Sequence, residues 1–191
     1  MTRLVPVVIL VGVMWLLEIL DWALPGDLDG YGIESRETDG LTGVVASPFL
    51  HADFAHLMAN TIPFLILGGV VALRFPQRFW AITATIIVGS GLGVWLLGPA
   101  NTITVGASGV VFGYLGFLLV AGLLTRHWID VVIGLAVLFV YGGMLVGTLP
   151  FGVSQGVSWL APLLGATAGV LAAFWFARQP QPRPAVAASP Y

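Results

Sequence analysis

The chain has 191 residues, of which 58% are hydrophobic and only 8% are charged, and its formal net charge is −2. An ordinary soluble domain carries about 25% charged residues, so this composition cannot cover a water-facing surface and predicts an integral membrane protein. Because cysteine is absent, disulfide bridges, thiolate nucleophiles and cysteine-based metal sites are excluded.

Six long apolar runs divide the chain, and each is long enough to cross a hydrocarbon core of about 30 Å as a helix. They are Leu4–Leu20 (extendable to Leu24), Phe54–Leu73, Phe79–Leu97, Val105–Leu124, Ile129–Leu149 and Val157–Ala177. Glycine, proline and charged residues separate the runs, and most connections are short. We therefore expect an all-α integral membrane protein, a bundle of six transmembrane helices. A cleaved signal peptide is an alternative for the first run, but Glu18 and the lack of a small-residue cleavage site favour a helix.

Two segments lie outside these runs. Residues 21–50 mix aromatic and aliphatic residues with acids, and they are more than a turn between two helices needs. We expect this loop to be folded and partly seated in the membrane interface. Residues 179–191 are rich in proline and alanine, which predicts a disordered tail. The expected organisation is one membrane domain, residues 1–178, followed by this tail.

The arginines predict the orientation of the bundle. The chain has no lysine, and if all six runs span, every arginine except Arg36 falls on the same side. By the positive-inside rule that side is the cytoplasm, and most acidic residues lie on or next to the opposite loop. We predict that both termini are cytoplasmic (N-in, C-in), in a multi-pass protein of a bacterial cell membrane.

Polar residues from three runs fall at one depth near the outer surface. His56 and Asn60, four apart in the second run, share a helix face. Ser108 lies near the start of the fourth helix, where unpaired N–H groups and the helix dipole favour negative charge, the requirement of an oxyanion hole. Pro162 lies in the outer turns of the sixth. Polar groups are costly inside a membrane, so a functional site is the default interpretation.

Structural explanations exist for each feature taken singly. Gly106–Gly109 could be a close-packing segment whose serine bonds back to its own helix, and the histidines and asparagine could hold helices together. A transporter or channel is disfavoured because the runs lack paired buried charges and a broken-helix repeat. Only the joint pattern favours catalysis.

Two motifs resemble those of the rhomboid family of intramembrane serine proteases. Residues 51–60 read His-Ala-Asp-Phe-Ala-His-Leu-Met-Ala-Asn, and residues 106–113 read Gly-Ala-Ser-Gly-Val-Val-Phe-Gly. The likeness covers nearly the whole chain, including 31–41 in the loop and 141–143 in the fifth run.

The resemblance implies an endopeptidase that cleaves transmembrane segments of membrane proteins, with no metal or cofactor. It assigns Ser108 as the nucleophile, His56 and Asn60 as oxyanion ligands, and His51 as a histidine that is usually structural. The expected partners are transmembrane segments and the lipid bilayer, and no nucleic acid.

The sixth run departs from the family pattern. Rhomboids carry their general base in a Ser-Trp-x-x-His-x-x-Gly context, and here Pro162 stands in the histidine's place, three residues before Gly165. Proline accepts no proton, and a serine without a base is a poor nucleophile. The sequence therefore predicts an impaired protease or, alternatively, a pseudoprotease that binds or escorts membrane-protein clients.

A substitute base is the remaining question. His127 is excluded because it follows Ser108 by 19 positions, a rise of roughly 28 Å along a helix. His51 or His56 could serve if the second helix shifted, although His56 would then leave the oxyanion site. An alteration at position 162 by engineering or a sequencing error is also left open.

Overall fold

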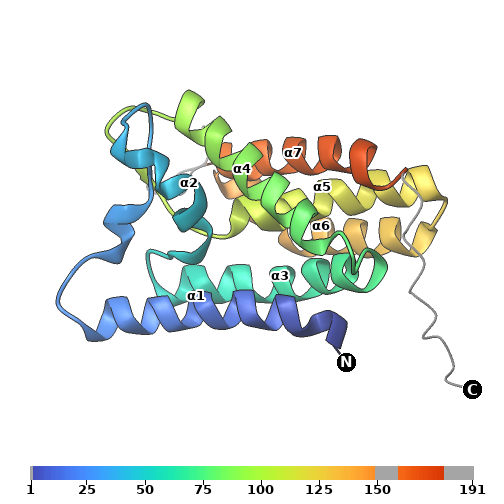
Figure 1. Ribbon diagram of the computed structural model, residues 1–191, viewed down its shortest axis with the longest axis horizontal. Helices are drawn as coiled ribbons and strands as arrows, with labels where there is room; N and C mark the ends of the chain where they lie inside the picture. Colours follow the sequence, from blue (N-terminus) through green and yellow to red (C-terminus); the bar gives the residue numbers. More distant parts are fainter. Residues whose placement is uncertain (1, 149–158, 179–191) are drawn as a thin grey trace, which may run out of the picture.

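The computed structural model describes residues 2–148 and 159–178. Within these ranges, six long helices run alongside one another and make up most of the structure (Figure 1). They are α1 (Val5–Ala23), α3 (Phe54–Arg74), α4 (Phe79–Leu97), α5 (Ser108–Thr125), α6 (Trp128–Thr148) and α7 (Leu160–Phe176). Each helix coincides with one of the predicted apolar runs to within three residues at either end. The predicted tail, residues 179–191, lies outside the described residues.

Four helices of the described chain are long and apolar enough to cross a membrane: Thr2–Ala23, Phe54–Arg74, Phe79–Leu97 and Ser108–Thr125. Two further apolar helices, Trp128–Gly142 and Leu160–Phe176, are shorter. Large apolar side chains such as Phe139 and Leu171 are exposed on the outside of the bundle. Extensive apolar surface of this kind marks contact with a membrane, so the chain is a multi-pass membrane protein.

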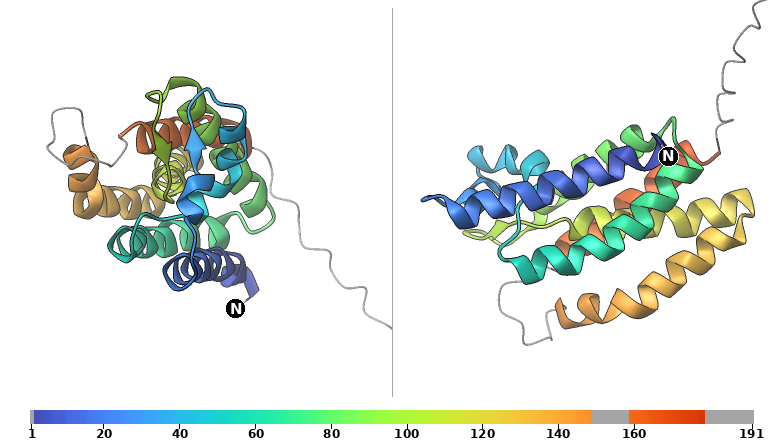
Figure 2. Two further views of the ribbon diagram at one scale, coloured as in Figure 1. Left: turned by 90° about the vertical axis from the view of Figure 1, so that its left-hand side faces the viewer. Right: turned by 90° about the horizontal axis from the view of Figure 1, so that it is seen from below.

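Helix α5 forms the centre of the bundle. Seen nearly end-on, it lies among the other helices (Figure 2, left), and every residue from Gly109 to Leu118 is buried. Helix α7 packs closely along it, because a Cβ atom on Gly165 would overlap the Gly109 carbonyl. Small residues allow helix backbones to approach in this way. The contact fixes the first turn of α7 beside the first turn of α5.

The loop between α1 and α3 is folded, as predicted. It contains four short helices and a strand: η2 (Leu28–Tyr31), β1 (Ile33–Glu34), η3 (Asp39–Leu41), α2 (Gly43–Ala46) and η4 (Ser47–Phe49). Strand β1 pairs antiparallel with β2 (Ile103–Thr104), with Ile33 opposite Thr104. The loop is therefore attached to the segment that leads into α5. Its seating in the membrane interface stays a prediction.

Helix α5 begins three residues later than the apolar run suggested. The run starts at Val105, but the chain turns at Gly106, whose φ of 116° is a conformation that favours glycine. The Gly106 N–H donates to the Ser47 carbonyl at 2.8 Å. This turn ends the β2 segment and makes Ser108 the first residue of α5.

Candidate functional site

The starts of α3, α5 and α7 meet at one end of the bundle, on the left in Figure 1. The His56 ring lies directly against Gly106, since a Cβ atom placed there would be 2.6 Å from His56 Cε1 and 2.8 Å from Nε2. The Ala161 carbonyl, in the first turn of α7, lies 3.4 Å from a Cβ atom placed on Gly109. The three segments that carry the candidate residues are thus neighbours.

Ser108 opens α5 and is partly buried. The N–H groups of Val110 and Val111 both bond to the Ala107 carbonyl, at 2.9 Å. The N–H groups of Ser108 and Gly109, by contrast, have no hydrogen-bond partner in the part of the chain that the structure describes. Free donors at a helix start are suited to hold an anion. Ser108 is therefore adjacent to unused N–H groups.

The close helix contact that the glycines permit predicts that Ser108 lies within the distance of a hydrogen bond to α3. Among the described residues none joins the Ser108 hydroxyl to α3. The contact is made instead by Gly106 against the His56 ring and by the Ala107 N–H. The positive φ of Gly106 explains the difference, because it turns these two residues toward α3 before the helix begins.

Asp53 starts the helix that carries His56 and Asn60. Its carboxylate accepts the His56 N–H at 2.7 Å, an N-cap contact. One turn deeper, Asn60 is only 2% exposed and its Nδ2 donates to the His56 carbonyl at 3.0 Å. An amide nitrogen carries two hydrogens, so one donor of Asn60 is left for another acceptor. His56 and Asn60 share the buried side of α3 that faces the start of α5.

His51 has a different position from the other candidates. It precedes α3, is 2% exposed, and its Nε2 accepts the Ala107 N–H at 3.3 Å. Its ring centroid lies 5.2 Å from that of His56. Burial, and next the neighbouring His56, lower the pKa of His51 to about 3. A neutral imidazole is required for the acceptor role, so His51 positions the residue before Ser108.

Pro162 occupies the third position of α7 and is buried. Proline is tolerated in a first helical turn because the N–H it lacks would have no helical partner there. The chain holds three histidines, and none is on α7. His127 follows the far end of α5, where its Nδ1 lies 3.0 Å from Asp130 Oδ1. Position 162 therefore offers no proton acceptor.

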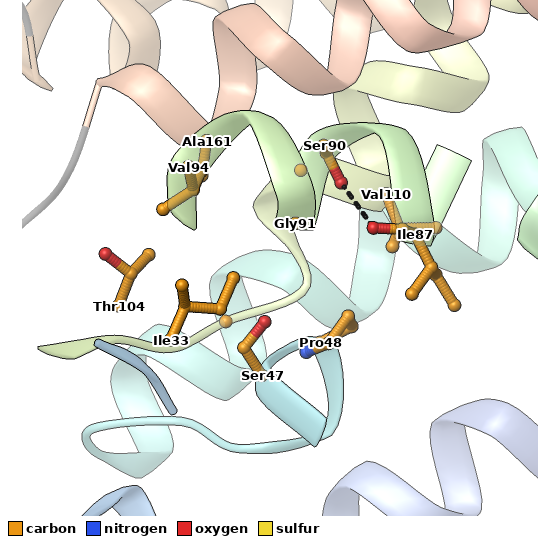
Figure 3. Close-up of a pocket in the computed structure, with 12 residues that line it drawn as sticks. Ile33, Ser47, Pro48, Ile87, Ser90, Gly91, Val94, Thr104, Val110 and Ala161 are labelled. Atoms are coloured by element: carbon orange, nitrogen blue, oxygen red, sulfur yellow. Dashed lines mark hydrogen bonds between the residues drawn. The ribbon is translucent and has the colours of Figure 1, made fainter. Parts of the chain in front are cut away.

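A small cavity adjoins the starts of α5 and α7 and has room for about one water molecule (Figure 3). Its lining includes Gly106 and Gly109, which flank Ser108 in the sequence, together with Ala161, Ser47 and Ser90. Neither of these two serines was singled out from the sequence. Ser90, between two glycines in an apolar run, was detectable as a polar residue inside a span, whereas nothing local marked Ser47.

Comparisons with known proteins identify the family of the chain. A Rhomboid domain matches residues 38–179, which is most of the chain. The chain belongs to the rhomboid family.

Its relatives include mycobacterial and plant proteins. An uncharacterised protein of Mycobacterium tuberculosis is 49% identical over 170 residues, covering 86% of this chain and 71% of the relative. An uncharacterised protein of Mycobacterium leprae is 42% identical over 176 residues, with 89% and 70% coverage. The chloroplastic Rhomboid-like protein 11 of Arabidopsis thaliana is 38% identical over 71 residues, which is 36% of this chain and 25% of that protein.

Proposed function

We propose that this chain is a rhomboid-type intramembrane serine endopeptidase scaffold whose hydrolytic activity is impaired by Pro162. The substrates of this scaffold are transmembrane segments of membrane proteins, approached from within the lipid bilayer. The observation that carries the proposal is the buried proline in the first turn of α7, where the family pattern has its general base. The match to a Rhomboid domain supports the family part of the proposal.

The proposed topology has six spans, with both termini in the cytoplasm of a bacterial cell, and one membrane domain over residues 1–178. The arginine contacts support a common cytoplasmic end. Arg74 Nε lies 3.0 Å from Asp130 Oδ2, and Arg78 donates to the Phe176 carbonyl at 2.7 Å. Arg36 lies at the other end of the bundle, where it donates to the Gly98 carbonyl at 2.7 Å.

Each site residue has a proposed role that follows from its position. Ser108 Oγ attacks the scissile carbonyl, and the negative charge that develops on the carbonyl oxygen is held by the unused Ser108 N–H, by His56 and by the remaining N–H of Asn60. His51 keeps Ala107 and the start of α5 in place. The missing part is the proton acceptor, because the Pro162 side chain has no lone pair to offer.

The same observation favours a second candidate, a pseudoprotease that binds or escorts membrane-protein clients. Loss of one member of a serine-histidine pair typically costs several orders of magnitude in rate. The packing of α7 on α5 nevertheless remains close at Gly165 and Gly169. A scaffold that keeps its shape while lacking its base would still present a surface to a transmembrane segment.

Restoration of the base tests the proposal. We expect the unaltered chain, purified in detergent or reconstituted in vesicles, to cleave a model transmembrane substrate slowly or not at all. Pro162→His should raise cleavage and also labelling of Ser108 by a fluorophosphonate probe. The Pro162→His chain with Ser108→Ala should lose both gains, and Pro162→Ala is the matched control for removal of proline alone.

One result would contradict the proposal. Ser108-dependent cleavage by the unaltered chain at the rate of the Pro162→His variant would show that Pro162 does not impair the site. His51→Ala and His56→Ala in the unaltered chain would then identify which histidine takes the proton.

A further inference from the structure

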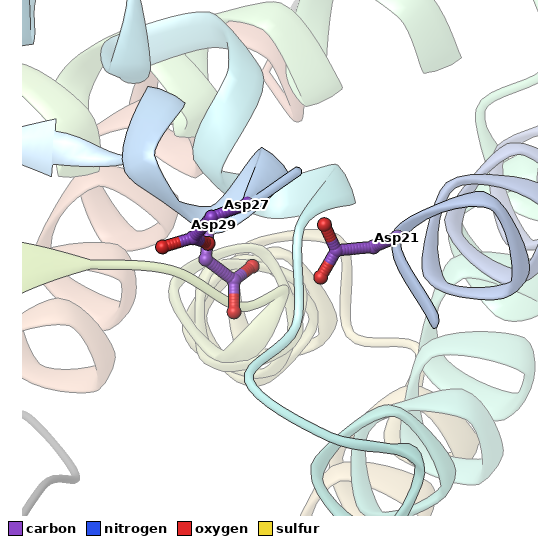
Figure 4. A group of neighbouring side chains, drawn as sticks. All are labelled: Asp21, Asp27 and Asp29. Carbon is purple, nitrogen blue, oxygen red and sulfur yellow. The ribbon is translucent and has the colours of Figure 1, made fainter. Parts of the chain in front are cut away.

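The loop between α1 and α3 has two separate attachments to the bundle. Its first part is tied to α1, where the Leu28 N–H donates to Asp21 Oδ1 at 2.6 Å. Asp21 also faces Asp27 and Asp29 there, and one carboxylate oxygen from each lies within 4.8 Å of the other two (Figure 4). Its second part, residues 33–51, contacts the end of α4 and the segment that leads into α5. This second part is therefore the one that can act on the serine site.

Arg36 makes the attachment to α4. Its backbone N–H donates to the Trp95 carbonyl at 2.9 Å, and its Nη1 donates to the carbonyls of Gly98 at 2.7 Å and Leu96 at 3.4 Å. These carbonyls belong to the last turn and the C-cap of α4, where carbonyl groups lack helical partners and the helix dipole favours a cation. Arg36 therefore binds the end of α4 with three hydrogen bonds.

The backbone of Arg36 is held in an uncommon conformation. Its φ is 65°, in the left-handed region that is unfavourable for a residue with a Cβ atom. On one side, Ser35 Oγ donates to the Val94 carbonyl at 3.2 Å. On the other side, Trp95 Nε1 donates to the Glu37 carbonyl at 2.8 Å. The neighbours thus hold Arg36 on α4 from both sides, and strained backbone that is over-determined in this way clusters at functional sites.

The connection from α4 to α5, residues 98–107, is held by the same loop at both ends. Its start is Gly98, whose carbonyl Arg36 binds. Its middle forms β2, which pairs with β1 just before Arg36 in the chain. Its last two N–H groups, those of Gly106 and Ala107, donate to acceptors of the loop at 2.8 and 3.3 Å. The residue after this connection is the serine, so its place is set by how the loop holds the connection.

We propose that Arg36 is a positioning residue for the serine site: it anchors the start of the connection, so that the N–H groups of Ser108 and Gly109 are fixed where they can receive a negatively charged oxygen. Donors of an oxyanion pocket are effective when they are in place before the charge develops. Both N–H groups belong to the first turn of α5, whose direction follows that of the connection before it. The inference deepens the proposed function and rests on it, because the oxyanion role of these groups belongs to that proposal.

Hydrogen exchange, measured by NMR in micelles, tests the anchor without any chemistry at the serine. In the chain that retains Pro162, Arg36→Ala should raise the exchange rates of the Gly106 and Ala107 N–H groups about tenfold, because the connection is no longer fixed at its start. Arg36→Lys keeps a cation near the Gly98 carbonyl and should recover part of the protection. Unchanged exchange at Gly106 and Ala107 in Arg36→Ala would overturn the inference.

Arg78→Ala is the matched control for a general loss of stability. Arg78 also donates to a carbonyl at the end of a helix, that of Phe176 at 2.7 Å, but at the opposite end of the bundle. This variant should lower the free energy of unfolding and leave exchange at Gly106 and Ala107 unchanged. A rise in exchange as large as that in Arg36→Ala would mean that any destabilisation loosens the connection, and it would contradict the positioning role.

Activity measurements separate this inference from the proposed function. In the Pro162→His background, Arg36→Ala should lower kcat and the rate of fluorophosphonate labelling of Ser108 about tenfold, with little change in KM, because the pocket acts on the transition state. Arg78→Ala should change neither rate. Added methylguanidinium, well below a denaturing concentration, should restore part of the rate in Arg36→Ala, which a general loss of structure would not allow.

Two results have different consequences for the two proposals. Unchanged labelling and kcat in Arg36→Ala, made in the Pro162→His background, would overturn the positioning role. Absence of labelling in the Pro162→His chain itself would contradict the proposed function, while the exchange rates would still decide whether Arg36 anchors the connection.

Discussion

The two ends of the helix bundle differ in how a buried carboxylate is paired. At the proposed cytoplasmic end, Asp130 is 1% exposed and Arg74 lies 3.0 Å from it. At the other end, and within the described residues, Glu18 is buried without a partner for Oε2, and the N–H groups of Ser108 and Gly109 have no hydrogen-bond partner. Both ends face the same energetic penalty for buried charge.

The comparison identifies the polar groups that hold helices together. Contacts at the cytoplasmic end connect different helices, as when Arg78 of the α3–α4 connection donates to the Phe176 carbonyl of α7. The unpaired groups at the outer end make no such connection among the described residues. Native proteins keep few buried polar groups unsatisfied, and those that persist cluster at functional sites.

The largest effect on stability is expected at the close contact between α5 and α7. Gly165→Ala would place a Cβ atom onto the Gly109 carbonyl, which is backbone and cannot move aside. We expect a loss of about 3 kcal/mol in the free energy of unfolding, measured by denaturant titration in micelles. Gly12→Ala is the control, because a Cβ atom there meets nothing within 4 Å. Equal stability of the two variants would show that α5 and α7 do not depend on this close approach.

The next largest effect on stability concerns the ion pair between Arg74 and Asp130. Arg74→Ala leaves Asp130 buried without this cation, and removal of one partner of a fully buried pair costs about 3–5 kcal/mol. The Arg74 side chain is 33% exposed, so we expect a smaller loss of about 2–3 kcal/mol. Combining Arg74→Ala with Asp130→Asn should recover part of the stability, since no buried charge is left. A double variant as unstable as Arg74→Ala alone would contradict this account of the contact.

The smallest effect on stability is expected from protonation of His51 as the pH falls. Its pKa is about 3 in the folded chain, against 6.5 when unperturbed. The unfolded chain therefore binds more protons between these values, so stability is full above pH 6.5 and falls as the pH drops toward 3. The loss at pH 5 is at most about 2 kcal/mol.

His51→Gln tests this dependence by comparison with the unaltered chain. The variant should show a shallower loss of stability between pH 7 and pH 5, because glutamine does not titrate. His56 is present in both proteins, so the difference between them reports on His51. Identical pH dependence would mean that His51 is not held neutral by its burial and its contact with Ala107.

The sequence predicted which segments form helices better than it predicted the residue at which each helix begins. An apolar run has to be long enough to span the hydrocarbon, so Phe79–Leu97 was predicted to the residue. The fourth run was continued back to Val105, because hydrophobicity does not distinguish a strand from a helix over so few residues. Pairing of β2 with β1 and the turn at Gly106 decided that boundary.

The candidate site was only partly predictable for a similar reason. Side-chain identity and spacing were enough to select Ser108, His56 and Asn60 and to notice that Pro162 stands where a histidine was expected. Their roles stay predictions. The contact of Ala107 with His51 was not predictable, since it depends on the path of the backbone between β2 and α5.

The sequence by itself determined the membrane class, the positions of the helices, the resemblance to rhomboids and the residue at position 162. These are properties of local composition and side-chain chemistry, which do not depend on how distant segments meet. Only the tertiary structure decided that the His56 ring lies on Gly106 and that carboxylate oxygens of Asp21, Asp27 and Asp29 lie within 4.8 Å of one another. Such contacts require the loop to fold back on α1 and α5. A hydrogen bond such as that from the Leu28 N–H to the Asp21 carboxylate is specified by that fold and not by spacing in the chain.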